Sequence, residues 1–133
     1  MRGALLDTMA VLRAVYCPKQ LSRKAGLRML EPDAGPLFYS VASLWEIGQK
    51  MSRGGYPDVE VPADWNEVIP KGLHEQGINR IEIEPRHCKR IETLPFHHKA
   101  PFDRMILAQA LAGDLELISS DAVADDYGLT MIW

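Results

Sequence analysis

Short apolar runs alternate with helical segments along the whole chain, and this alternation limits the possible folds more than any other feature. Strand-length runs are expected at residues 4–6, 37–39, 81–83, 115–118 and 130–133. Helices are expected at residues 9–16, 21–30, 41–51, 63–76, 86–93 and 101–112. Thr8 is predicted to cap the first helix, and Ser40 or Ser43 the third. Such alternation is typical of an α/β sandwich with a central, mostly parallel sheet.

The length of 133 residues suits one compact domain, so we expect a single domain over residues 1–133. The longest uncharged run, residues 34–45, is too short to span a bilayer. Asp7 interrupts the first apolar stretch too early for a signal peptide. Cys17 and Cys88 lack zinc-ligand spacing and are interpreted as reduced cysteines. A cytoplasmic protein without membrane association is therefore expected.

Acidic residues occur where an α/β sheet collects its functional side chains, outside the carboxyl ends of the strands. Asp7 and Asp121 follow expected strands, while Glu46 and Asp103 lie in otherwise apolar helical segments. A carboxylate in apolar surroundings must be paired, protonated or bound to a metal ion. Magnesium prefers oxygen ligands, and it would remove the repulsion between converging acids. Taken singly, Asp7 could instead be a helix cap, Asp103 a favourable charge at a helix start, and Asp121 a turn residue.

The net charge of −3 is not that of a protein that coats nucleic acid. Nucleic-acid chemistry at an acidic metal site would then need local basic residues. The best cluster precedes and follows Asp103, and we predict that His98, Lys99 and Arg104 contact phosphate. Elsewhere, Arg13, Lys50 and Arg53 could also contact RNA or the antitoxin, but solvated helix faces are the preferred interpretation.

Several motifs resemble those of a known family in its order and spacing. They are Leu5–Thr8, Ser40–Ile47, Leu94–Ala110 and Leu117–Asp121, with Tyr127-Gly128 and Trp133 fitting the usual ending. Together they resemble PIN domains, and in particular the VapC-type toxins of type II toxin–antitoxin systems. The stretch Pro101–Arg104 with its helix is the most specific of these matches.

This resemblance implies a PIN-like three-layer α/β/α sandwich and a magnesium-dependent endoribonuclease, with manganese as a possible substitute. It implies an RNA substrate, a homodimer and a cognate antitoxin protein. By position, Asp7, Glu46, Asp103 and Asp121 would be the metal-binding and catalytic acids. Thr8 and Ser119 would be supporting hydroxyls that orient the acids.

The chain departs from the family at two positions, with Met9 where a His is frequent and Ala100 where an acid is frequent. A catalytically weak or inactive PIN domain that serves as an RNA- or protein-binding module is therefore the alternative. Phosphatases of the haloacid dehalogenase type need a second Asp two residues after the first, where this chain has Met9. A receiver-type signalling domain would have paired acids early in the chain and a late Lys, neither of which is evident.

Overall fold

The computed structural model describes residues 2–31, 33–97, 100–121 and 126–133, and these residues form one α/β unit. Its strands are β1 (Ala4–Leu6), β2 (Leu37–Ser40), β3 (Ile78–Ile81), β4 (Glu116–Ile118) and β5 (Met131–Ile132). Its α-helices are α1 (Thr8–Tyr16), α2 (Arg23–Leu30), α3 (Val41–Met51), α4 (Trp65–Glu75), α5 (Pro85–Glu92) and α6 (Pro101–Ala112). A short 3-10 helix, η1 (Pro18–Gln20), follows α1. The sheet order is β3-β2-β1-β4-β5, and each pair is parallel.

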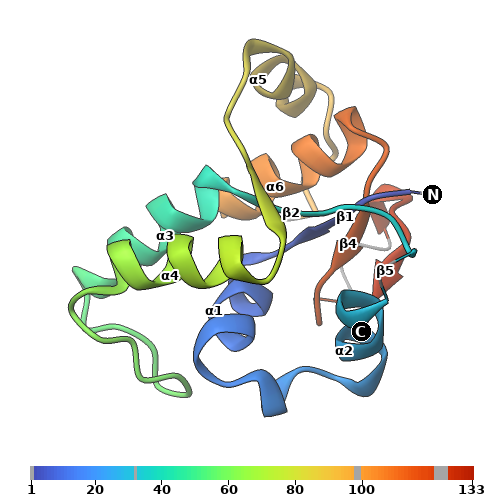
Figure 1. Cartoon of the computed structure of the whole chain (residues 1–133). Helices are drawn as coiled ribbons and strands as arrows, with labels where there is room; N and C mark the ends of the chain where they lie inside the picture. The colour runs from blue at the N-terminus through green and yellow to red at the C-terminus, as the bar shows by residue number, and fades with distance from the viewer. Residues whose placement is uncertain (1, 32, 98–99, 122–125) are drawn as a thin grey trace.

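Helices cover both faces of this sheet, as Figure 1 shows, which confirms the predicted sandwich. Successive strand residues point to opposite faces, so a strand buried on both sides supplies two cores. Ala4 and Leu6 of β1 belong to a core with α1, α3 and α4, whereas Leu5 belongs to a core with α6. All three β1 residues are fully buried. The central strand thereby fixes the segment that follows it, which begins with Asp7.

The third strand differs from its prediction at residues 81–83, because β3 spans Ile78–Ile81. Its partner β2 ends at Ser40, which lies opposite Ile81, and α3 begins at the next residue. Ile83 still packs in the same core as Ile81, so the alternation is present. The backbone beyond Ile81 has no strand left to pair with, and the apolar pattern alone does not reveal that.

The helix starts also refine the predictions. Asp7, not Thr8, caps α1, since its side chain accepts a hydrogen bond from the Ala10 backbone N–H. Ser40 caps α3 in the same way, as predicted, through the Ala42 N–H. Pro70 lies within α4 without dividing it. No helix among the described residues has the length and apolar character needed to cross a bilayer.

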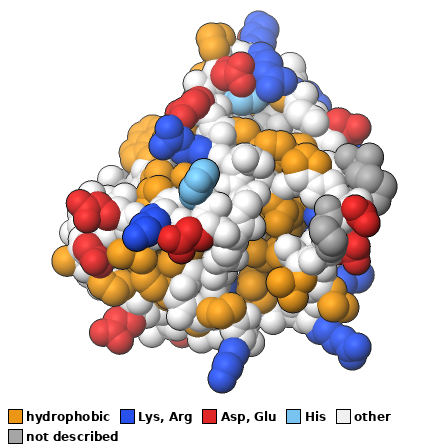
Figure 2. Space-filling view, in the orientation of Figure 1, with side chains coloured by type: hydrophobic (Ala, Val, Ile, Leu, Met, Phe, Trp, Pro, Cys, Tyr) orange, Lys and Arg blue, Asp and Glu red, His pale blue; other side chains and the backbone are white. Residues whose placement is uncertain are grey.

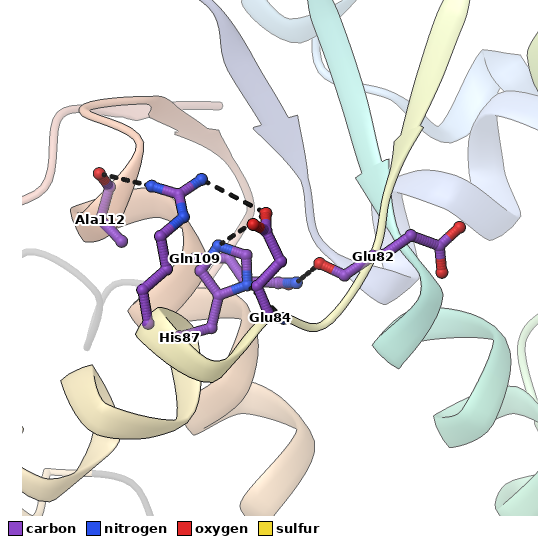
Figure 3. A network of polar contacts seen from close by, with 6 residues as sticks. Glu82, Glu84, His87, Gln109 and Ala112 are labelled. Atoms are coloured by element: carbon purple, nitrogen blue, oxygen red, sulfur yellow. Dashed lines mark hydrogen bonds and ion pairs between the residues drawn. The ribbon is translucent and has the colours of Figure 1, made fainter.

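A polar network built on two buried side chains, His87 and Gln109, links α5 and the segment before it to α6 (Figure 3). Gln109 of α6 donates through Nε2 to the Glu82 carbonyl at 3.2 Å. The Glu84 N–H donates to His87 Nδ1 at 3.0 Å, and the His87 ring also hydrogen-bonds the backbone of Glu82. His87 and Gln109 are only 2% and 1% exposed. These four residues are called the His87–Gln109 network below.

Candidate active site

The carboxyl end of β1 positions Asp7 at the centre of the site. The Asp7 backbone N–H donates to the Ile118 carbonyl of β4 at 3.0 Å, which ties the two neighbouring strands together where both end. Its side chain accepts from the Ala10 N–H at 2.8 Å. Capping α1 and facing the site are therefore compatible roles, because a carboxylate has acceptor capacity left after one such bond.

A small cavity lies beside Asp7 at this edge of the sheet. Asp7, Asp103 and Asp121 line it together with Ser119, and its floor is apolar. Asp103 comes from the first turn of α6, and Asp121 follows β4. The volume of about 20 Å³ is room for one particle of water or ion size. Three of the four predicted acids thus share one cavity.

Burial raises the pKa of the Asp7 carboxyl from 3.8 to about 6. Hydrogen bonds from Ser119 and the Ala10 backbone oppose this rise, and the charge of Asp103 adds to it. The carboxylate therefore ionises against both its surroundings and a like charge. Such a group is stabilised by a cation placed in the cavity.

Glu46 does not line the cavity but is electrostatically coupled to it. Burial raises the pKa of Glu46, and the charges of Asp103 and Asp7 raise it further. The Thr8 hydroxyl donates to Glu46 Oε1 at 2.5 Å and opposes the rise. The predicted acids are thus brought to one region by β1, α3, α6 and the segment after β4.

The two predicted hydroxyls each contact an acid. Ser119 hydrogen-bonds the Asp7 side chain, and its Oγ accepts from the Asp121 N–H at 3.0 Å. Thr8, which is 5% exposed, contacts Glu46 and also lies 3.0 Å from Ser43 Oγ. Ser43 was not predicted as a site residue. Its signal in the sequence is a hydroxyl one helical turn before Glu46 in an otherwise apolar helix.

The donor set fits a hard divalent cation, because it consists of carboxylate and hydroxyl oxygens. Within the described ranges, however, no three His, Cys, Asp or Glu side chains already converge as ligands of one ion. Magnesium binds proteins through one or two carboxylates and keeps several waters, so it does not need a closed protein cage. Asp7, Asp103 and Asp121 therefore line a cavity of the right chemistry and size for one such ion.

The predicted basic cluster lies only partly within the described residues. His98 and Lys99 lie outside the described residues. Arg104 is buried, and its guanidinium donates to the carbonyl of Pro95 at 2.9 Å and to those of Ile91 and Leu94. Arg104 therefore binds the segment between α5 and α6 from within, and we do not include it among the proposed RNA contacts.

Comparison with known proteins adds family and fold. The profile of the PIN domain family matches residues 4–128. No curated protein sequence matches the chain. VapBC2 from Rickettsia felis, bound to a DNA fragment from its promoter, is 14% identical, with a TM-score of 0.68 over 97% of this chain and 96% of that one. VapBC-1 from nontypeable Haemophilus influenzae is 16% identical, with a TM-score of 0.61 over the same two shares, 97% and 96%. A toxin–antitoxin complex from Klebsiella pneumoniae is 21% identical, with a TM-score of 0.51 over 89% and 86%.

Proposed function

The chain belongs to the PIN-domain family, and we propose that it is a magnesium-dependent endoribonuclease, the toxin of a toxin–antitoxin pair. The observation that carries the proposal is the cavity that Asp7, Asp103 and Asp121 share. An acidic cavity of this kind has no structural advantage, since its charges repel one another and one pKa is strongly raised. The structural neighbours of the chain are VapBC toxin–antitoxin complexes, which supports the toxin role.

Asp7, Glu46, Asp103 and Asp121 would hold the ion. Bound magnesium supplies an acidified water and stabilises charge on the attacked phosphate. The protein's own residues fix the geometry, because Ser119 holds Asp7 while its Oγ also accepts from the Asp121 backbone. Thr8 holds Glu46 from the first turn of α1.

We further propose that the protein works in the cytoplasm as a homodimer that a cognate antitoxin inhibits. Trp45 of α3 is 62% exposed and packs edge-on against Phe102 of α6, with ring centroids 4.9 Å apart. The two helices also carry Glu46 and Asp103, so this aromatic pair, in which Trp45 is exposed and Phe102 half-buried, lies on the elements that build the site. Exposed aromatic side chains are enriched in protein interfaces, which supports a protein partner beside the acids.

Cleavage of a pool of structured RNAs by the purified protein, free of partners, tests the nuclease. Reactions contain magnesium, manganese or chelator, and Asp7→Asn is the inactive variant. Asn also caps helices well, so this variant keeps the start of α1. Glu75→Gln removes one exposed carboxylate at the end of α4 and is the matched control.

We expect metal-dependent cleavage by the wild type and by Glu75→Gln, and none by Asp7→Asn. The fragments would identify the target RNA. Folded wild-type protein that leaves every RNA intact with either metal would contradict the nuclease and favour a binding module.

A further inference from the structure

Two cations act on the acids of the site from different helices. The charge of Arg13 on α1 lowers the pKa of Asp7, and the charge of Lys50 on α3 lowers that of Glu46. Lys50 follows Glu46 by four residues, so both lie on one face of α3. Arg13 lies past the middle of α1, but helical side chains lean toward the helix start, which here is Asp7.

Each of these cations lies against an aromatic ring and forms no ion pair with another described residue. The Arg13 guanidinium carbon lies 5.2 Å from the centroid of the Trp133 ring, and Lys50 Nζ lies 5.8 Å from that of Tyr56. Cations within about 6 Å of a ring centroid are attracted by it. Among the described residues no carboxylate lies within ion-pair distance of either cation. Arg13 Nε is also buried and has no hydrogen-bond partner among the described residues.

The sheet order places the strands that lead to the two cation–aromatic pairs on opposite sides of β1. Trp133 directly follows β5, which lies beyond β4, while Lys50 and Tyr56 follow β2 on the other side of β1. Asp7 at the end of β1 lies between them. A polyanion that crosses the cavity along this edge of the sheet would therefore run between the strand that precedes Trp133 and the strand that precedes α3, the helix that carries Lys50.

On the face drawn in Figure 2, positive charge is not concentrated in one place. On the face seen in Figure 2, Lys and Arg side chains are scattered among Asp and Glu side chains and do not form one continuous basic surface. The net charge of the chain is −3. Cations close to the acids would then favour binding of RNA, and among the described residues Arg13 and Lys50 act on Asp7 and Glu46.

We propose that Arg13 and Lys50 bind phosphates of a single RNA strand on the two sides of the acidic cavity. The Trp133 ring would hold Arg13 in place, and the Tyr56 ring would hold Lys50. The inference rests on the proposed nuclease function, because it assigns these contacts to its substrate. Both residues position the strand, and neither touches the reacting atoms.

Salt-dependent binding of a labelled single-stranded oligoribonucleotide tests this proposal. Fluorescence anisotropy is measured with calcium in place of magnesium, and a gel verifies that the RNA stays intact. Each phosphate contact to a single strand contributes about 0.7 to the slope of log K against log salt concentration. We expect Arg13→Gln and Lys50→Gln each to reduce the slope by about 0.7, and the double variant by about 1.4.

Two further variants separate binding from folding and from net charge. Arg13→Lys keeps the charge and should keep the wild-type slope. Lys89→Gln makes the same change of net charge on α5, where Lys89 pairs with Glu92, and should leave the slope unchanged. Folded Arg13→Gln and Lys50→Gln proteins with the slope of Lys89→Gln would overturn the proposal.

The result is independent of the nuclease test. RNA that is cleaved in magnesium while the slopes stay unchanged refutes the phosphate contacts alone. If the slopes fall as expected but the protein cuts no RNA in magnesium, the phosphate contacts are supported and the nuclease function is refuted.

Discussion

Helix α6 joins two polar regions that are built in opposite ways. At its first turn, Asp103 shares a cavity with Asp7, whose pKa is raised by burial and by the charge of Asp103. Further along, Gln109 belongs to the His87–Gln109 network, in which donors meet acceptors within the protein (Figure 3). One atom of that network, Gln109 Oε1, is without a hydrogen-bond partner among the described residues. A buried polar group with internal partners serves the fold, whereas acids left to repel one another are suited to a cation.

The two regions also respond to acid in opposite directions. The folded protein holds a proton on Asp7 up to a pKa of about 6, whereas the unfolded chain loses it near 3.8. The folded state therefore loses stability as the pH rises from 3.8 to 6. Burial lowers the pKa of His87 below its ordinary 6.5, so the folded protein binds this proton less readily than the unfolded chain does. The folded state therefore loses stability as the pH falls below 6.5.

The largest effect is expected from Asp103→Asn, which removes a charge from the cavity. Cleavage should fall roughly a thousandfold, or about 4 kcal/mol of transition-state stabilisation, because a metal ligand is lost. Single-turnover cleavage at saturating magnesium measures this effect. Glu75→Gln, which removes an exposed acid, should retain the wild-type rate of cleavage. Equal rates for Asp103→Asn and Glu75→Gln would show that the acidic cavity is not the site of cleavage.

The Asp7 carboxyl should destabilise the metal-free protein at neutral pH. The rise of its pKa by about two units corresponds to an upper limit of about 3 kcal/mol. Asp7→Asn should therefore increase the free energy of unfolding at pH 8 in chelator, while keeping the helix cap. The gain should shrink below pH 6 and vanish near 3.8. Urea titrations across this range measure it, with the exposed Asp58→Asn as the control.

The network should show the reverse pattern, a loss of stability without a loss of chemistry. His87→Ala removes a buried ring and leaves the Glu84 N–H without its acceptor, which should cost about 2 kcal/mol. Cleavage per folded molecule should stay unchanged. The decline of wild-type stability below pH 6.5 should also flatten in this variant. His74→Ala, at an exposed position of α4, is the matched control.

The sequence predicts the cavity better than it predicts the network, for a physical reason. Asp7 and Asp103 are polar interruptions of apolar segments, and the carboxyl ends of parallel strands lie at one edge, so their meeting follows from local patterns. His87 and Gln109 are ordinary polar residues of two helices. Their contact depends on how α5 packs on α6, which no local pattern specifies. The displaced third strand has the same cause, since Ile81 ends β3 only because β2 ends opposite it.

Arg104 shows the limit of reasoning from neighbouring positions. It adjoins Asp103 in sequence, but one residue along a helix turns a side chain by about 100°. Its guanidinium therefore binds the carbonyls of Leu94 and Pro95. The cations whose charge acts on the acids are instead Arg13, on the helix that Asp7 caps, and Lys50, four residues after Glu46 on α3.

The smallest effect is expected from the loss of one partly buried hydrogen bond in the acidic site, the bond between Thr8 and Glu46. Thr8→Val keeps the shape of the side chain but removes the hydroxyl that donates to Glu46, so the pKa of Glu46 should rise further. The magnesium concentration for half-maximal cleavage should then increase about tenfold, the usual cost of losing a residue that orients a ligand. Thr8→Ser keeps the hydroxyl and should retain the wild-type requirement. If Thr8→Val instead lowered the free energy of unfolding and left the magnesium requirement unchanged, the Thr8 hydroxyl would serve the fold, as the His87–Gln109 network does. The first turn of α1 would then have a structural role and not a chemical one.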